Sequence, residues 1–121
     1  MQTRTGNCYV RRTPFHSPDP VLQVSLSCVG GAVENLVRAV APELAQTGRR
    51  INVVSPGLIE TPMFGEAGEA RSAKMVAGTA NNAIKRAGKP EEVAKGIMFV
   101  IENDFVTGTT VDVDGGWLCS M

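Results

Sequence analysis

The 121-residue chain has few aromatic side chains, no excess of charge of either sign and no long hydrophobic run. Aromatic residues make up 5% of the sequence, so a core has to be built mainly from Val, Ala, Leu and Ile. Basic and acidic residues both number 12, which disfavours dedicated binding to nucleic acid or to an anionic membrane surface. No stretch approaches the ~18 consecutive apolar residues of a membrane span, and we expect none.

Cysteine is scarce and unpatterned. Cys8, Cys28 and Cys119 are odd in number and form no C-x-x-C pair, so they indicate neither a disulfide framework nor a zinc knuckle. The N-terminal residues lack the apolar stretch of a secretory signal. We therefore expect a cytoplasmic protein with reduced thiols.

The first half of the chain predicts three segments. Residues 1–20 show neither a strand nor a helix period and end in a cluster of turn residues, which predicts an irregular arm. Residues 21–29 (VLQVSLSCV) alternate apolar and polar side chains, and the pair Gly30-Gly31 follows them, so a strand is expected. Residues 31–46 predict an amphipathic helix. Its apolar positions are Val33, Leu36, Val37, Val40, Ala41 and Leu44.

The second half alternates strand and helix patterns. Residues 50–55 (RINVVS) form a short apolar run typical of a strand buried on both faces of a parallel sheet. Residues 63–83 are rich in Ala, interrupted by Gly and only loosely periodic, which predicts a mobile helical flap. Pro90 starts a further helix that ends near residues 103–104, and residues 109–113 alternate as a strand. The expected fold is α/β, with a short parallel sheet of three to four strands and flanking helices.

Three sequence blocks carry a family resemblance. They are GAVENLVRAVAPELA at 31–45, RINVVSPGLIETP at 50–62, and RAGKPEEVA at 86–94 together with FVTGTTVDVDGG at 105–116. In this order they resemble the C-terminal half of the short-chain dehydrogenase/reductase family, whose members are Rossmann-fold NAD(P)-dependent oxidoreductases. With residues 1–20 taken as the irregular arm, the resemblance implies that residues 21–121 are the C-terminal half of a Rossmann-like domain. It also implies the family's activity, the interconversion of alcohols and carbonyls. It does not identify a substrate.

Two parts of the family's machinery are missing from the sequence. The T-G-x-x-x-G-x-G turn, whose backbone N–H groups hold the dinucleotide pyrophosphate, occurs nowhere in the chain. The family's Tyr, and the Lys four residues after it, are replaced by Leu26 and Gly30. The single tyrosine, Tyr9, is followed four residues later by Thr13. We therefore expect no catalytic residues and an inactive chain.

The nicotinamide-facing turn is present. By resemblance, Pro56 and Gly57 shape the turn, Ile59 offers backbone groups to the nicotinamide carboxamide of NAD or NADP, and Thr61 offers its hydroxyl. A simpler interpretation explains the same residues: Pro-Gly ends a strand, and Thr61 with Pro62 begins a helix. Because the pyrophosphate cradle is missing, both interpretations stay open.

Other candidate sites have simpler interpretations. Asp112 and Asp114 could hold a divalent cation, but two carboxylates are an incomplete shell and both suit the end of a strand, so no metal is expected. His16 could pair with a cysteine thiol, although a lone His in a Pro-rich arm is more often solvated. The basic pairs Arg49-Arg50 and Lys85-Arg86 are expected to be solvated charges.

The predicted half-fold leaves surface to be covered. Its strands would lack neighbours, and the apolar stripe of the 31–46 helix is broad for so small a core. We expect a homo-oligomer, or a complex with a longer relative, through this helix. Two alternatives to an enzyme remain: a non-catalytic interaction module, and a gene fragment without function.

Overall fold

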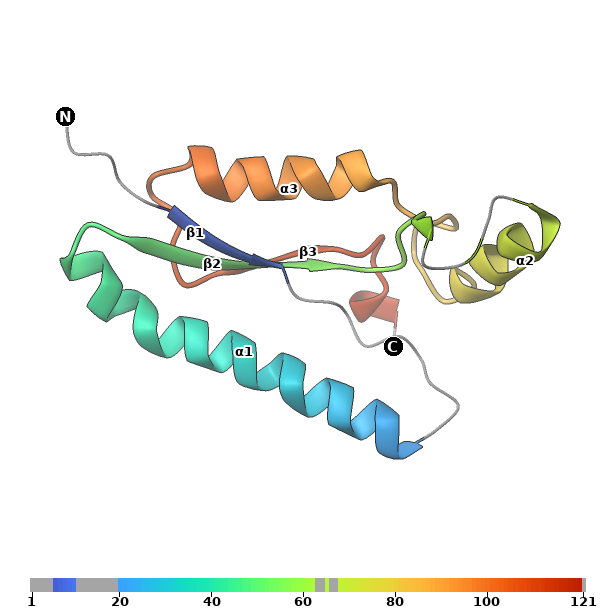
Figure 1. Ribbon diagram of the computed structural model, residues 1–121, viewed down its shortest axis with the longest axis horizontal. Coiled ribbons are helices and arrows are strands. Elements are labelled where there is room, and N and C mark those ends of the chain that lie inside the picture. Colours follow the sequence, from blue (N-terminus) through green and yellow to red (C-terminus); the bar gives the residue numbers. More distant parts are fainter. Residues whose placement is uncertain (1–5, 11–19, 63–64, 66–67, 121) are drawn as a thin grey trace.

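Strands and helices alternate along the chain (Figure 1). A computed structural model describes residues 6–10, 20–62, 65 and 68–120. In chain order the elements are β1 (Gly6–Val10), α1 (Pro20–Gln46), β2 (Arg50–Pro56), α2 (Glu69–Gly78), α3 (Pro90–Glu102), β3 (Thr110–Val113) and a short 3-10 helix (Leu118–Ser120). The α/β class is therefore confirmed. Within the described residues, no helix combines the length and the apolar character needed to cross a membrane.

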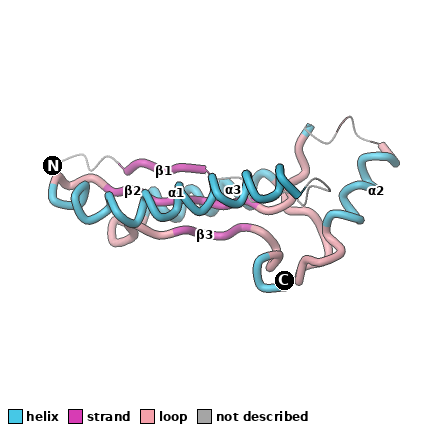
Figure 2. Tube along the Cα trace, turned by 90° about the horizontal axis from the view of Figure 1, so that it is seen from below, coloured by secondary structure: helices cyan, strands magenta, loops and turns pink. Residues whose placement is uncertain are grey.

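The sheet has three parallel strands in the order β1-β2-β3. Cys8 stands opposite Asn52 in the first pair, and Val53 stands opposite Thr110 in the second. Helix α3 lies over one face and α1 under the other (Figure 1), and Figure 2 shows the strands side by side with β2 in the middle. The expected short parallel sheet is confirmed.

The core is centred on β2. Val53, Val54 and Ser55 are fully buried, and Asn52 is nearly so, as expected for a strand covered on both faces. Helix α1 contributes Val37 and Ala41 to the core, and α3 contributes Val100.

The N-terminal third differs from the prediction. Residues 21–29 belong to α1 and not to a strand, and the helix continues through Gly30, Gly31 and Pro42. Gly30 is buried in this helix, where the absence of a side chain permits close packing. The first strand is instead Gly6–Val10, inside the segment expected to be irregular. Residues 1–5 and 11–19, with His16, lie outside the described part of the chain.

Of the two later helices, α3 matches its sequence prediction and α2 does not. Helix α3 starts at Pro90 and ends at Glu102, as its sequence predicts. Helix α2 starts at Glu69, well after Thr61, and Gly68 at its N-cap provides no side-chain cap. Only Met75 of α2 is buried. Residues 63–64 and 66–67 of the predicted flap lie outside the described residues.

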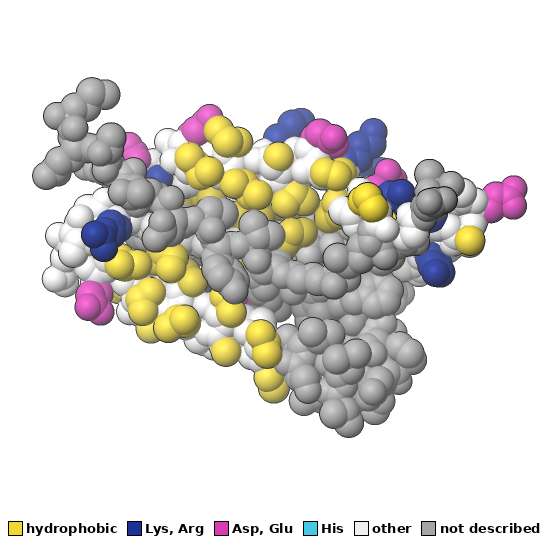
Figure 3. Space-filling model, in the orientation of Figure 1, with side chains coloured by type: hydrophobic (Ala, Val, Ile, Leu, Met, Phe, Trp, Pro, Cys, Tyr) yellow, Lys and Arg dark blue, Asp and Glu magenta, His cyan; other side chains and the backbone are white. Residues whose placement is uncertain are grey.

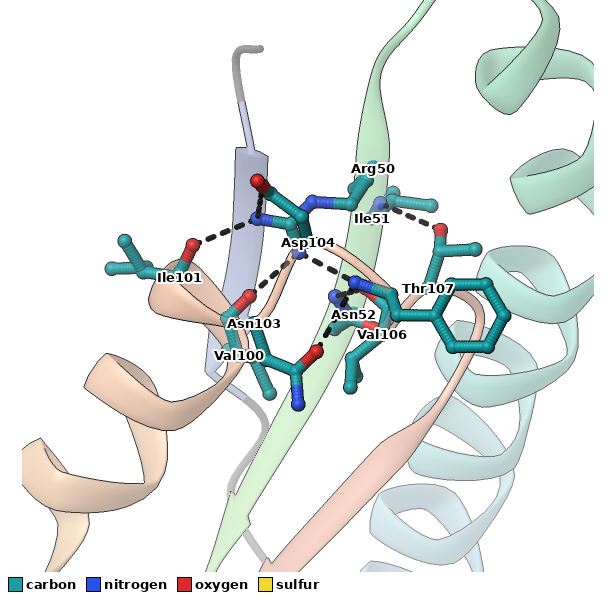
Figure 4. A network of polar contacts seen from close by, with 10 residues as sticks. Arg50, Ile51, Asn52, Val100, Ile101, Asn103, Asp104, Val106 and Thr107 are labelled. Carbon is teal, nitrogen blue, oxygen red and sulfur yellow. Dashed lines mark hydrogen bonds and ion pairs between the residues drawn. The ribbon is translucent and has the colours of Figure 1, made fainter.

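Arg50 ties β2 to the end of α3 (Figure 4). It is 7% exposed, so the expectation of a solvated charge is wrong. Its Nη1 donates to the carbonyls of Val100 at 2.7 Å and Val106 at 3.0 Å, and its Nη2 donates to Ile101 at 2.8 Å. The Asp104 carboxylate lies 3.7 Å away. The bonds to Val100 and Ile101 satisfy carbonyls in the last turn of α3, which have no partner inside the helix, and the bond to Val106 holds the loop that follows.

Asn52 completes this network from the same strand. Its Nδ2 donates to the Val106 carbonyl at 3.0 Å, and its Oδ1 accepts from the Thr109 N–H at 3.2 Å. The loop between α3 and β3 is thus bonded to β2 along its length. The amino-terminal half of β2 is therefore held by the end of α3 and by the loop that follows α3.

Candidate functional site

The candidate site lies where β2 and β3 end. Gly57 follows β2, and its N–H donates to the Val113 carbonyl at 3.0 Å. A Cβ at Gly57 would lie 2.6 Å from the Cα of Asp114, so the two backbones approach too closely for any other residue. In open parallel sheets, ligands bind beyond the carboxyl ends of the strands, which is the position of this turn.

Asp114 shapes the opposite side of the turn. It is buried, and its carboxylate accepts hydrogen bonds from the backbone N–H groups of Gly116 at 2.8 Å and Leu118 at 3.0 Å. Both oxygens are therefore used to hold the chain after β3. Asp112 is exposed, and the described residues contain no cluster of three side chains suited to a metal ion.

Ile59 presents a backbone N–H and C=O that bond to no other residue in the described part of the chain. It forms an isolated parallel bridge with Gly88, made by the Gly88 N–H bonding to the Leu58 carbonyl and the Glu60 N–H bonding to the Gly88 carbonyl, both at 2.9 Å. In a parallel bridge of this kind, the N–H and C=O of the central residue point to the opposite side. Ile59 thus offers one donor and one acceptor side by side, which suits a primary amide.

Thr61 lies two residues beyond Ile59 and is partly exposed. It does not cap α2, because that helix begins at Glu69. Pro56, Gly57, Ile59 and Thr61 therefore form one continuous stretch after β2.

Arg86 and Glu92 support the Gly88 segment. The Arg86 guanidinium donates to both carboxylate oxygens of Glu92, at 2.8 and 2.6 Å, and the Lys89 N–H donates to the same carboxylate at 2.7 Å. The Arg86 hydrogen bond, followed by that of Lys89, lowers the pKa of Glu92 to about 2. The pair fixes the start of α3 and the loop that bonds to residues 58–60.

Arg86 is exposed, as its interpretation as a solvated charge predicts, but its ion pair with Glu92 was not expected from the sequence. A signal was present: Glu92 is the third residue of a helix that starts at Pro90, the position from which a Glu side chain reaches back to the N-cap N–H. Nothing local indicates the ion pair with Arg86, which forms across the turn before the helix.

The positions of the missing catalytic pair lie in α1. Gly30 has no side chain and Leu26 has no proton to transfer, while Tyr9 is in β1 opposite Val53. A phenol and an ammonium group are thus absent from the positions at which the resemblance would place them.

Comparison with known proteins gives a consistent result. The family model described as enoyl-(acyl carrier protein) reductase matches residues 26–118. The short-chain reductase protein NovJ of Streptomyces niveus is 36% identical over 100 residues, covering 78% of this chain and 38% of that protein. Galactitol 2-dehydrogenase of Rhizobium johnstonii is 37% identical over 109 residues, covering 88% of this chain and 41% of that protein.

The solved structures agree. The structure of ElxO with NADP bound matches with a TM-score of 0.74 and 29% identity, covering 94% of this chain and 46% of that one. The chain spans less than half the length of each of these three proteins.

Proposed function

Because the chain belongs to the short-chain dehydrogenase/reductase family, we propose that it is the nicotinamide-contacting half of an NAD(P)-dependent oxidoreductase fold. The reaction of such a fold interconverts an alcohol and a carbonyl. The observation that carries the proposal is the free N–H and C=O of Ile59, at the carboxyl end of β2. The NADP-bound structure of ElxO supports the choice of cofactor.

In this proposal the nicotinamide supplies hydride chemistry, and the chain supplies binding and orientation. The Ile59 N–H donates to the carboxamide oxygen, the Ile59 carbonyl accepts from the carboxamide N–H, and the Thr61 hydroxyl adds a further polar contact. Gly57 lets the turn approach Asp114. Gly88, held by the pair of Arg86 and Glu92, keeps residues 58–60 extended.

The chain by itself does not catalyse hydride transfer in this proposal. Leu26 and Gly30 leave the substrate oxygen without a proton donor, and general acid catalysis is typically worth ~10² to 10⁴ in rate. No glycine turn is present to hold the pyrophosphate, so affinity for the whole dinucleotide is expected to be low.

The test is titration of the purified chain with NADH and with NADPH, followed by nicotinamide fluorescence. We expect weak binding that Thr61→Val reduces severalfold, and no turnover of a panel of carbonyl substrates. Thr107→Val is the control, because the Thr107 hydroxyl accepts from Ile51 at the other end of β2. Absence of any binding would contradict the nicotinamide site, and turnover that Thr61→Val abolishes would contradict inactivity.

A second candidate function is a non-catalytic interaction module in the cytoplasm. It is favoured by the exposed apolar side chains of α1: Val29 is 65% exposed and Leu36 is 60% exposed. Contact through residues 31–46 would cover Leu36, in a homo-oligomer or on a longer relative. The free thiols of Cys28 and Cys119 are consistent with a reducing compartment.

A further inference from the structure

The two segments that form the candidate site carry charged side chains of one sign. Residues 51–62, which include most of β2 and the turn after it, contain Glu60, and residues 105–120, which include β3, contain Asp112 and Asp114. Neither segment contains Lys or Arg. Charge is balanced over the whole chain, but the site itself has an excess of negative charge.

Glu60 lies beside the free backbone groups of Ile59. It stands between Ile59 and Thr61, and its own N–H donates to the Gly88 carbonyl at 2.9 Å, which fixes the backbone at this residue. The Glu60 side chain is exposed, and it forms no ion pair with another residue in the described part of the chain. Its carboxylate is therefore available to a charged group that binds at residues 59–61.

Asp114 adds a second carboxylate on the β3 side of the turn. Its Cα would lie 2.6 Å from a Cβ at Gly57, so it is in close contact with the chain two residues before Ile59. Asp114 is buried, and in the described part of the chain its carboxylate is bonded to the backbone N–H groups of Gly116 and Leu118 and to no cation. Its charge acts over a longer range than that of an exposed carboxylate, because water and salt screen it less.

The basic side chains before α3 offset only part of this charge. Arg86 is already bonded to both carboxylate oxygens of Glu92. The Glu92 hydrogen bonds, and more weakly the charge of Glu60, raise the pKa of Arg86. Residues 85–92 hold three basic and two acidic side chains, which leaves one positive charge against the three carboxylates of the site segments. Figure 3 shows Lys and Arg interspersed with Asp and Glu over α2 and α3.

Helix α1 supplies no cation near the site. Residues 20–37 contain neither Lys nor Arg, and Gly30 stands where the family resemblance places a Lys. The first basic residue of the helix is Arg38, which lies eight residues after Gly30, or about 12 Å along the helix axis. The ammonium group that the resemblance implies beside the cofactor is therefore missing.

The two redox forms of a nicotinamide differ in charge. The ring carries a positive charge when it is oxidised and is neutral when it is reduced, whereas the carboxamide is the same in both forms. The hydrogen bonds of Ile59 therefore do not distinguish the two forms, but a negative electrostatic potential at the site does.

We propose that Glu60, together with Asp114 on the other side of the turn, makes this site select the oxidised, positively charged nicotinamide over the reduced, neutral one. The inference rests on the nicotinamide site proposed above, and it assigns Glu60 as the residue that determines which redox form binds. The attraction acts between charges that are not in contact, so it decreases as the salt concentration rises.

The test uses two probes that share the carboxamide and differ in charge: 1-methylnicotinamide is a cation, and nicotinamide is neutral. Each is titrated into the full chain at low salt, and the NMR chemical shift of the Ile59 amide measures binding. The cation is expected to bind about threefold to tenfold more tightly to the wild type. Glu60→Gln should reduce this preference by about threefold, and Glu60→Lys should reverse it. Glu102→Gln, which removes an exposed carboxylate at the far end of α3, is the matched control and should keep the preference.

Circular dichroism checks that each variant is folded. High salt provides a second measurement on the wild type: it should weaken the binding of 1-methylnicotinamide and leave that of nicotinamide unchanged. Equal binding of the two probes to the wild type overturns the inference and leaves the nicotinamide site standing. A preference that Glu60→Gln leaves intact also overturns it. If neither probe shifts the Ile59 amide, the nicotinamide site itself is wrong, and the inference fails with it.

Discussion

At the scale of single residues, close backbone contacts decide the form of the candidate site. Gly57 meets the backbone of Asp114, and Gly88 meets the end of the Ile59 side chain, where an added Cβ would lie 2.7 Å from Cδ1. A flexible side chain can move away, but a strand backbone cannot. Gly57 is therefore the more stringent of the two positions.

Gly57→Ala is expected to lower the free energy of unfolding by about 1 to 3 kcal/mol, because two strand ends must separate to admit the methyl group. Gly31→Ala is the matched control. A Cβ at Gly31 in α1 would have no neighbour within 4 Å, and this change should stabilise the chain by about 0.5 to 1 kcal/mol. Urea denaturation at a fixed protein concentration measures both. Equal stability of Gly57→Ala and the wild type would contradict the close approach.

The ion pair of Arg86 and Glu92 predicts that the free energy of unfolding depends on pH. The pKa of Glu92 falls from 4.5 to about 2 on folding, so its stabilising contribution is complete above pH 4.5 and is lost as the pH falls toward 2. Glu92→Gln should remove this part of the fall in the free energy of unfolding, measured by urea denaturation between pH 4.5 and about pH 2. Glu91→Gln, which changes the adjacent carboxylate of the same helix, should retain it. An unchanged fall in Glu92→Gln would show that the pair does not form.

At the scale of elements, the sequence predicted those whose signals are local. The start of α3 follows from Pro90 and two acids, and the burial of β2 follows from an apolar run ended by Pro-Gly. The alternation in residues 21–29 indicated a strand, but helix formation is cooperative and extends through a favourable neighbour. The strand Gly6–Val10 is too short to show a period, and its position depends on pairing with β2.

The turn residues after β2 were found through resemblance, and the free groups of Ile59 emerged only with its bridge to Gly88. That bridge joins segments 29 residues apart in sequence, and no local pattern encodes it. Arg50 shows the same limit: its carbonyl partners come from a helix 50 residues later.

Helix α2 is expected to open before α3. It lies beyond the end of the sheet (Figure 1) and buries only Met75, so local opening exposes little apolar surface. Limited trypsin digestion should cleave at Arg71 and Lys74 of α2 before Lys95 of α3, although Lys74 and Lys95 are both exposed. Mass spectrometry identifies the cut sites. Cleavage at Lys95 as early as at Lys74 would contradict this order.

At the scale of the whole molecule, charge is balanced and several large apolar side chains, Val29 and Leu36 among them, are exposed. A homo-oligomer formed through residues 31–46, as proposed above, is therefore expected to respond little to salt, because copies without net charge neither attract nor repel at long range. The dissociation constant should change by less than about threefold between low and high ionic strength. Sedimentation equilibrium at two salt concentrations measures it. A strong weakening by salt would indicate an interface held by ion pairs.

The order of the strands along the chain also determines how long β2 stays uncovered during synthesis. Asn52 lies on β2, and its partner Thr109 follows 57 residues later, near the end of the chain. At about 5 to 20 residues per second, a ribosome takes roughly 3 to 11 seconds to make that stretch. During this interval β2 has already been synthesised, but β3 and the helix α3 that cover it have not. In a nascent chain, β2 is therefore expected to stay partly uncovered until α3 and β3 have been made.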